Sequence, residues 1–179
     1  MLKLTIPGQE LFDEETLEFS KLPDITLQLE HSLVSISKWE ATWCKPFLDG
    51  KEKSNEEIID YIHCMMIDDN IDMKVIGNMT ADNFKEINKY IEAPMTATTF
   101  NNIEKSYSRE IVTSELIYYW MVSYNIPFEC QHWHLNRLLT LIKVCNIKNN
   151  PPKKMSKQEL VARNRALNKA RREQMNSKG

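Results

Sequence analysis

The densest group of candidate metal ligands is Cys130, His132 and His134, within the run C-Q-H-W-H. If this run is helical, Cys130 and His134 share one face because they are four residues apart, whereas His132 points roughly the other way. Three ligands from the run could then not converge on the tetrahedral sphere of one zinc ion. Cys145, a further candidate ligand, lies about four turns along the same helix. We therefore expect no metal site here, and interpret these residues as buried parts of a helix.

The neighbouring pair His63–Cys64 could represent a thiol activated by a histidine. Adjacent side chains diverge on a helix, so catalysis at this pair is not expected. The paired acids Glu56–Glu57 and Asp68–Asp69 lie in capping or loop contexts, where solvated charge is the usual role. The acidic run Asp68–Asp72 also lacks the central Gly and terminal Glu of a calcium loop.

Two acids, Glu115 and Glu129, differ because they interrupt an apolar stretch. Either is a candidate for a buried acid matched to Arg137 or Lys143, and a structural salt bridge is favoured over a general acid. The chain has no nucleophile elbow around a serine, no Walker lysine and no Cys-x-x-Cys. The sequence therefore predicts a protein that is not an enzyme and needs no cofactor.

The elements that carry these residues belong to a chain of 179 residues, 42% hydrophobic and 27% charged, which is typical of one globular domain. Its apolar runs are too short to cross a bilayer, and Pro7–Gly8 interrupts the N-terminus, so we expect neither a membrane span nor a signal peptide. An intracellular origin follows as the default. The cysteines are expected to be reduced and buried: Cys44, Cys64, Cys130 and Cys145.

Charge is divided unevenly along the chain. Residues 151–179 hold nine Lys/Arg and two Asp/Glu, net +7, so the other 150 residues hold 14 basic and 23 acidic residues, net −9. The basic tail could contact phosphates non-specifically, dock on an acidic partner, or simply be a solvated helix. Its candidate contact residues are Lys153, Lys154, Lys157, Arg163, Arg165, Lys169, Arg171 and Arg172.

The centre of the fold is predicted to be a helical hairpin between Ile111 and Ile147, whose second helix begins near Pro127. Its inner faces are predicted to carry Leu116, Tyr119, Trp120 and Tyr124 before the break and Leu135, Leu138, Leu139, Ile142 and Cys145 after it.

The remaining pattern predicts a mainly α fold of five to six helices with a small N-terminal β-hairpin and a basic C-terminal helix. Leu2, Leu4 and Ile6, and again Ile25, Leu27 and Leu29, alternate as in strands. Helices are predicted from Ser32 to near Pro46, with Leu33, Ile36, Trp39, Ala41, Trp43 and Phe47 inward, from Ser54 to about Met66, from Thr80 to Pro94, and after Ser156. For the second of these, the inner face is expected to hold Ile58, Ile59, Ile62, Met65 and Met66. The expected divisions are residues 1–31, 32–147 and 148–179.

The chain resembles a family of small proteins encoded among the tail and structural genes of bacteriophages and prophages of Gram-positive bacteria. The resemblance covers most of the chain and is carried by I-P-G-Q-E-L-F-D-E-E near the start, L-E-H-S-L-V-S-I-S-K-W-E at Leu29–Glu40, K-Y-I-E-A-P-M-T-A-T-T-F at Lys89–Phe100, I-V-T-S-E-L-I-Y-Y-W-M at Ile111–Met121, and the run from Trp133 to Ser156.

This resemblance implies a tail assembly chaperone that acts in the host cytoplasm and binds tail components, such as the tape measure or tail tube protein. The alternative is a virion component whose basic tail contacts DNA or an acidic neighbour, and self-association is open in either case. Because aromatic residues are enriched at binding hot spots, the candidate partner-binding residues are Trp39, Trp43, Trp120 and Trp133, although at least two of them are expected in the core.

Overall fold

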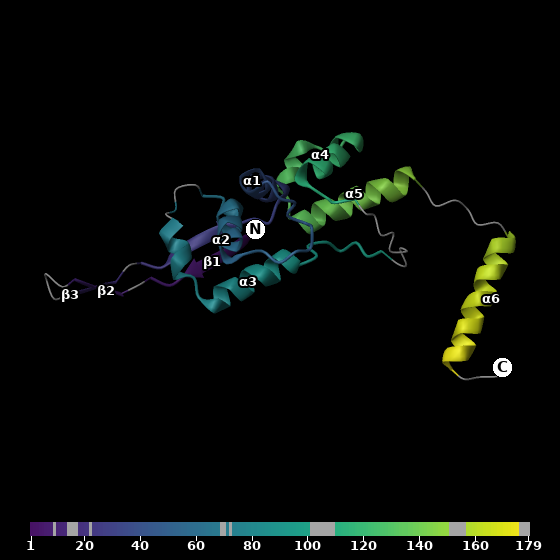
Figure 1. The fold of residues 1–179 in the computed structure, drawn as a ribbon, viewed down its shortest axis with the longest axis horizontal. Coiled ribbons are helices and arrows are strands. Elements are labelled where there is room, and N and C mark those ends of the chain that lie inside the picture. Colours follow the sequence, from purple (N-terminus) through teal and green to yellow (C-terminus); the bar gives the residue numbers. More distant parts are fainter. Residues whose placement is uncertain are drawn as a thin grey trace. The chain divides into compact units, whose positions relative to one another are not determined.

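A computed structural model describes residues 1–8, 10–13, 18–21, 23–68, 71, 73–100, 110–150 and 157–175. The described chain is mainly helical and has a small antiparallel N-terminal hairpin, as predicted (Figure 1). It divides into one compact unit, Met1–Cys145, and a second unit, Asn146–Gly179.

The strands are β1 (Leu2–Ile6), β2 (Glu10–Asp13), β3 (Glu18–Lys21) and β4 (Ile25–Leu29). The helices are α1 (Leu33–Trp43), α2 (Asn55–Met65), α3 (Ala81–Glu92), α4 (Ser114–Ser123), α5 (Leu135–Asn149) and α6 (Lys157–Gln174), with short 3-10 helices η1 (Met73–Asn78) and η2 (Phe128–His132).

The N-terminal hairpin forms because apolar residues alternate along both of its strands. β1 and β4 pair from Leu2 opposite Leu29 to Ile6 opposite Ile25. The inward side chains of this ladder, Leu4, Ile6, Leu27 and Leu29, are buried in the core, whereas Lys3, Thr5 and Thr26 are exposed. A second antiparallel ladder, β2 with β3, follows along the same hairpin after Pro7–Gly8, where the Gly8 amide donates to Asp24 Oδ1 at 2.9 Å. A two-stranded ladder is marginal alone, and α3 packs on β1 to stabilise it.

Helix starts follow the local capping signals of the sequence. Ser54 and Glu57 form the predicted capping box, in which the Glu57 amide donates to Ser54 Oγ and the Ser54 amide donates to Glu57 Oε2. Thr80 caps α3 through the Asn83 amide, again as predicted. Ser156, the predicted cap of the last helix, lies outside the described residues.

The predicted inner face of α2 is wrong in part. Ile58 and Ile59 are 39% and 40% exposed, whereas Tyr61, Ile62 and Met65 are buried. The Tyr61 ring packs on Phe47 with centroids 4.1 Å apart. Isoleucines at neighbouring positions cannot all face one side of a helix. In α1, Leu33, Ile36 and Trp39 are buried as predicted, but Ala41 is exposed.

The central helices depart from prediction at two points. The buried face of α4 holds Ile117 and Met121, while Tyr119 is exposed and Leu116, Trp120 and Tyr124 are half-buried. The second helix, α5, begins at Leu135 and not near Pro127, because Pro127 opens only the short helix η2 and Trp133 then adopts an extended backbone. The predicted inward residues of α5 are correct for Leu135, Leu138 and Ile142, which are buried, and Leu139 and Cys145 pack beside them half-buried.

No helix among the described residues is both long enough and apolar enough to span a membrane.

Candidate functional site

Two buried histidines join the start of α1 to the start of α5. The rings of His31 and His134 meet edge to face with centroids 5.0 Å apart. His31 Nδ1 contacts the Tyr61 hydroxyl, and His134 Nε2 lies 3.0 Å from the carbonyl oxygen of Tyr90. The Leu135 amide donates to the His31 carbonyl oxygen at 2.7 Å, so backbone and side chains both tie the two segments together.

The histidine pair is held neutral by its surroundings. Burial, and after it the nearby His134, lowers the pKa of His31 to about 3, and burial also lowers the pKa of His134. Burial likewise raises the pKa of Tyr61 above its ordinary value. His31, Tyr61 and His134 are 3%, 4% and 5% exposed, so a substrate has no access to them. The arrangement therefore serves to hold the fold together.

The Cys/His run does not form the continuous helix assumed from its sequence. Cys130 is buried in η2 and His132 is exposed, while His134 follows the break and points to Tyr90. Over the part of the chain that the structure describes, no group of three His, Cys, Asp or Glu side chains is arranged to hold a metal ion.

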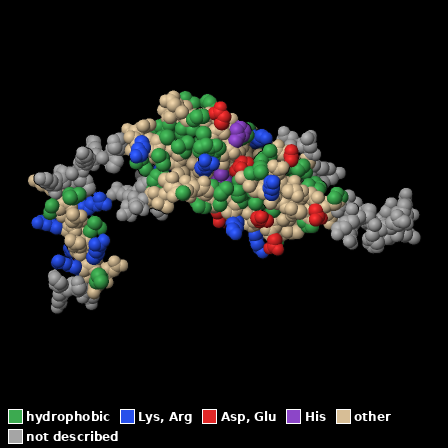
Figure 2. All heavy atoms as spheres, turned by 180° about the vertical axis from the view of Figure 1, so that it is seen from behind, with side chains coloured by type: hydrophobic (Ala, Val, Ile, Leu, Met, Phe, Trp, Pro, Cys, Tyr) green, Lys and Arg blue, Asp and Glu red, His purple; other side chains and the backbone are tan. Residues whose placement is uncertain are grey.

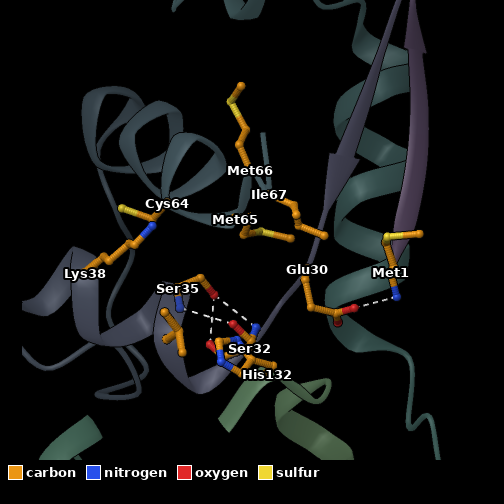
Figure 3. A pocket seen from close by; sticks show the side chains of 11 residues that line it. Met1, Glu30, Ser32, Ser35, Lys38, Cys64, Met65, Met66, Ile67 and His132 are labelled. Carbon is orange, nitrogen blue, oxygen red and sulfur yellow. Dashed lines mark hydrogen bonds and ion pairs between the residues drawn. The ribbon is translucent and has the colours of Figure 1, made fainter. Parts of the chain in front are cut away.

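A pocket of about 390 Å³ lies beside α1 and α2 (Figure 3). Cys64 and Lys38 lie on one side of it, and Glu30, paired with the Met1 amino group at 2.6 Å, lies on the other. Burial and the nearby Asp60 carboxylate raise the pKa of the Cys64 thiol to about 11. A protonated thiol is a poorer nucleophile than a thiolate, so these surroundings do not activate Cys64.

The cysteines do not all occupy the buried positions expected for them. Cys130 is buried, Cys64 and Cys145 are half-buried, and Cys44 is exposed at the end of α1. Cys44 is the αL residue that terminates this helix, with φ of 51°, and its amide donates to Glu40 O at 2.8 Å. Its position at a helix end explains its exposure. All four are free thiols.

The buried acid near the central hairpin is Glu40, not the predicted Glu115 or Glu129. Glu40 is 8% exposed, and its carboxylate oxygens accept hydrogen bonds from the backbone amides of Phe47 and Ser114, each at 2.7 Å. It thereby links the end of α1 to the first residue of α4. At this helix start the dipole of α4 also stabilises the negative charge of the carboxylate. Both Glu115 and Glu129 are exposed, because each lies on the outer side of its helix. Their predicted partners are elsewhere: Arg137 lies over the Trp133 ring and Lys143 over the Phe100 ring.

The four tryptophans differ in burial. Trp39 is 1% exposed and belongs to the core, where its Nε1 donates to Glu57 O at 2.9 Å. Trp43 stacks on it with centroids 6.2 Å apart and donates to Asp60 Oδ2. Trp120 and Trp133 are half-buried on α4 and after η2. Three tryptophans thus remain partly accessible to a partner.

The outer side of α4 carries exposed apolar residues. Tyr119 and Val122 are 65% and 59% exposed on α4, and Ile111 before the helix and Phe128 after it are 60% and 54% exposed. Tyr118 packs against Phe128, with ring centroids 6.3 Å apart, so η2 continues the apolar surface of the helix. We call Ile111, Tyr119, Val122 and Phe128 the α4 face. Hydrophobic side chains also gather on the upper part of the body in Figure 2, the level at which α4 lies.

The basic tail forms α6 in the described residues, and its basic side chains there are exposed. Arg165, Lys169 and Arg172 share one side of α6, because they are four and three residues apart, while Arg163 and Arg171 lie on other sides. Lys169 lies 4.0 Å from Glu173. Lys153 and Lys154 lie outside the described residues, as does the side chain of Lys157. Leu160, Val161 and Leu167 are also exposed on α6.

No protein-family model, curated protein or solved structure matches this chain.

Sequence reasoning missed His31, Glu40 and Val122, and it placed Tyr119 on the inner face of its helix. A signal for the outer positions Tyr119 and Val122 exists: no charged residue occurs between Leu116 and Tyr124, so this part of α4 has no charged side and cannot bury all of its apolar residues on one face. For His31 and Glu40 there is no local signal, because their partners lie far along the chain.

Proposed function

We propose that this chain is a non-enzymatic morphogenesis protein of a bacteriophage, a tail assembly chaperone that binds a tail component such as the tape measure or tail tube protein before assembly. The resemblance to phage proteins encoded among tail genes supports the phage assignment. The α4 face supports the binding role and is the observation on which the proposal depends.

An exposed cluster of large apolar side chains is costly to leave in water, and in monomeric proteins such clusters commonly mark interaction sites. Here the cluster sits on a helix that is fixed at its start, because Glu40 accepts the Ser114 amide and Thr113 caps the Leu116 amide. A rigid surface loses little conformational entropy when a partner binds. The α4 face therefore has the chemistry and the rigidity of a docking surface.

A second candidate function is a structural component of the phage particle. It is favoured by α6, whose exposed Arg165, Lys169 and Arg172 share one side and could pair with DNA phosphates or with an acidic neighbouring protein. The two candidates differ in whether the protein stays in the particle.

Co-expression with each tail protein encoded next to this chain, followed by co-purification, tests the binding role. We expect one tail protein to co-purify with the wild type and to be lost with Tyr119→Ser. Ile59→Ser provides the matched control, because Ile59 is an exposed apolar residue on α2, away from the α4 face. Retention of the partner by Tyr119→Ser, or its equal loss from both variants, would contradict a role for the α4 face.

Mass spectrometry of purified particles separates the two candidates. A chaperone is released during assembly and should be absent from the particle, whereas a virion component should be present at a fixed copy number. Detection of the chain at fixed copy number would reject the chaperone and favour the structural role.

A further inference from the structure

The surroundings of the α4 face are acidic as well as apolar. Residues 110–129 contain three Glu and no Lys or Arg. Glu115 lies on the same side of α4 as Tyr119 and Val122, because these positions are four and seven residues further along, and Glu129 directly follows Phe128. Both carboxylates are exposed. Glu115 thus lies on the side of α4 that carries the exposed apolar residues, and Glu129 adjoins Phe128 in η2.

The basic residue that lines a pocket with Glu115 is paired with another acid. Lys45 lines a shallow pocket of about 380 Å³ together with Thr113 and Glu115, but its Nζ is paired with Glu57 Oε1 at 2.7 Å. Hydrogen bonds from the helix start and from Thr113 lower the pKa of Glu115, so this carboxylate is ionised at neutral pH. The pocket beside it offers room for the aliphatic stem and charged end of a long basic side chain.

The kind of backbone that fits the α4 face is also restricted. α4 and η2 present side chains and no strand edge, so a partner cannot bind there by adding a strand. A helix that lies along α4 can instead pack an apolar stripe against Tyr119 and Val122 and reach Phe128. Residues beside that stripe then point toward the acidic side chains Glu115 and Glu129.

We propose that the occupant of the α4 face is an amphipathic α-helix of a partner protein, whose apolar stripe covers Tyr119, Val122 and Phe128 and whose flanking Lys or Arg residues pair with Glu115 and Glu129. This inference rests on the proposed function, since it names the chemistry of the partner segment at that same surface.

Two synthetic helical peptides of about 18 residues test this, with the same Leu and Ala stripe and either Lys and Arg or Glu beside it. Binding to the full chain is measured by fluorescence anisotropy. Because each exposed ion pair contributes about threefold, two pairs should make the basic peptide bind about tenfold more tightly than the acidic one at low salt. The difference should shrink as salt screens the charges.

Variants test whether Glu115 and Glu129 cause the difference in affinity between the two peptides. In Glu115→Gln/Glu129→Gln the two peptides should bind with nearly equal affinity, whereas the exposed control pair Glu86→Gln/Glu92→Gln on α3 should keep the wild-type difference. Tyr119→Ser should weaken both peptides, because both use the apolar stripe. Three results would overturn the inference. They are equal affinity for the basic and acidic peptides, tighter binding of the acidic peptide, and no binding of either peptide.

A second copy of the chain is the competing occupant. Sedimentation that shows a dimer which Tyr119→Ser dissociates would also overturn the inference. The outcome is separable from that of the proposed function: a tail protein that co-purifies through Tyr119 while neither peptide binds rejects only the basic helix. Conversely, peptide preference without any co-purifying tail protein rejects only the phage role.

Discussion

Mild acid should destabilise the unit Met1–Cys145 through its buried histidine pair. In the unfolded chain each imidazole titrates near its ordinary pKa of about 6.5, whereas burial and the neighbouring His134 lower the pKa of His31 in the folded chain to about 3. Below pH 6.5 the unfolded chain therefore binds a proton that the folded chain does not. The stability is fully present above about pH 6.5 and is lost as the pH falls from there toward about 3.

The expected loss is large relative to the total stability of a domain. Each pH unit in this window removes about 1.4 kcal/mol of unfolding free energy for each histidine that stays neutral when folded. From about pH 6.5 to 5, His31 alone should cost about 2 kcal/mol, and the lowered pKa of His134 adds a loss of the same sign. A domain has only about 5 to 15 kcal/mol in total. Carboxylates titrate mainly below this window, so the histidines dominate it.

Urea denaturation between about pH 7.5 and 5 measures the slope of unfolding free energy against pH. His31→Asn keeps a polar atom near the position of Nδ1 but removes the titrating group, so it should lower stability at neutral pH and reduce the slope by about 1.4 kcal/mol per pH unit. His63→Gln is the control, because it removes an imidazole that is exposed on α2. Parallel curves for the wild type and His31→Asn would refute the reasoning.

Three further predictions follow from the described contacts. Glu40→Ala leaves two buried amides without their acceptor and should cost about 2 to 5 kcal/mol in urea denaturation, whereas the exposed Glu86→Ala should change stability by less than about 0.5 kcal/mol. Trp39→Ala should cost about 3 to 5 kcal/mol because Trp39 fills the core and donates to a backbone carbonyl, and the half-buried Trp43 should cost less when replaced in the same way. Deletion of residues 151–179 should leave the urea midpoint of Met1–Cys145 unchanged, because that unit has its own core. The deletion should also abolish any binding to random duplex DNA. In the wild type such binding should fall steeply between about 50 and 200 mM salt.

The parts of the fold that sequence reasoning predicted are those with local signals. Alternating apolar residues predicted β1 and β4, and the Ser54–Glu57 and Thr80 caps predicted where α2 and α3 begin. These signals act over a few residues, so they are visible in the sequence itself. Alternation also restricts the register of β1 with β4, because both strands must turn the same alternating set inward, but it does not select one register among those that differ by two residues.

The contacts that join distant segments could not be predicted, because the residues that form them are far apart in the sequence. Glu40 meets the Ser114 amide 74 residues away, and the His31 ring meets that of His134 across an even longer separation. Nothing near Glu40 in the sequence distinguishes it from an exposed acid. Glu115 and Glu129 looked buried because their neighbours are apolar, yet apolar neighbours on a surface helix are equally compatible with an exposed acid at the edge of a docking surface.

The error in assigning the inner face of α4 follows from the same property that indicates a binding role. Between Leu116 and Tyr124 the helix has no charged side, so periodicity cannot tell its core face from its outer face, and the largest aromatic residues are naturally assigned inward. In the structure the smaller Ile117 and Met121 fill the space against the core, and Tyr119 is exposed. A helix that served only the core would need polar residues on its outer side to stay soluble. That Tyr119 and Val122 occupy this side instead is a local conflict with the requirements of the fold, and such conflicts in natural proteins concentrate at functional sites.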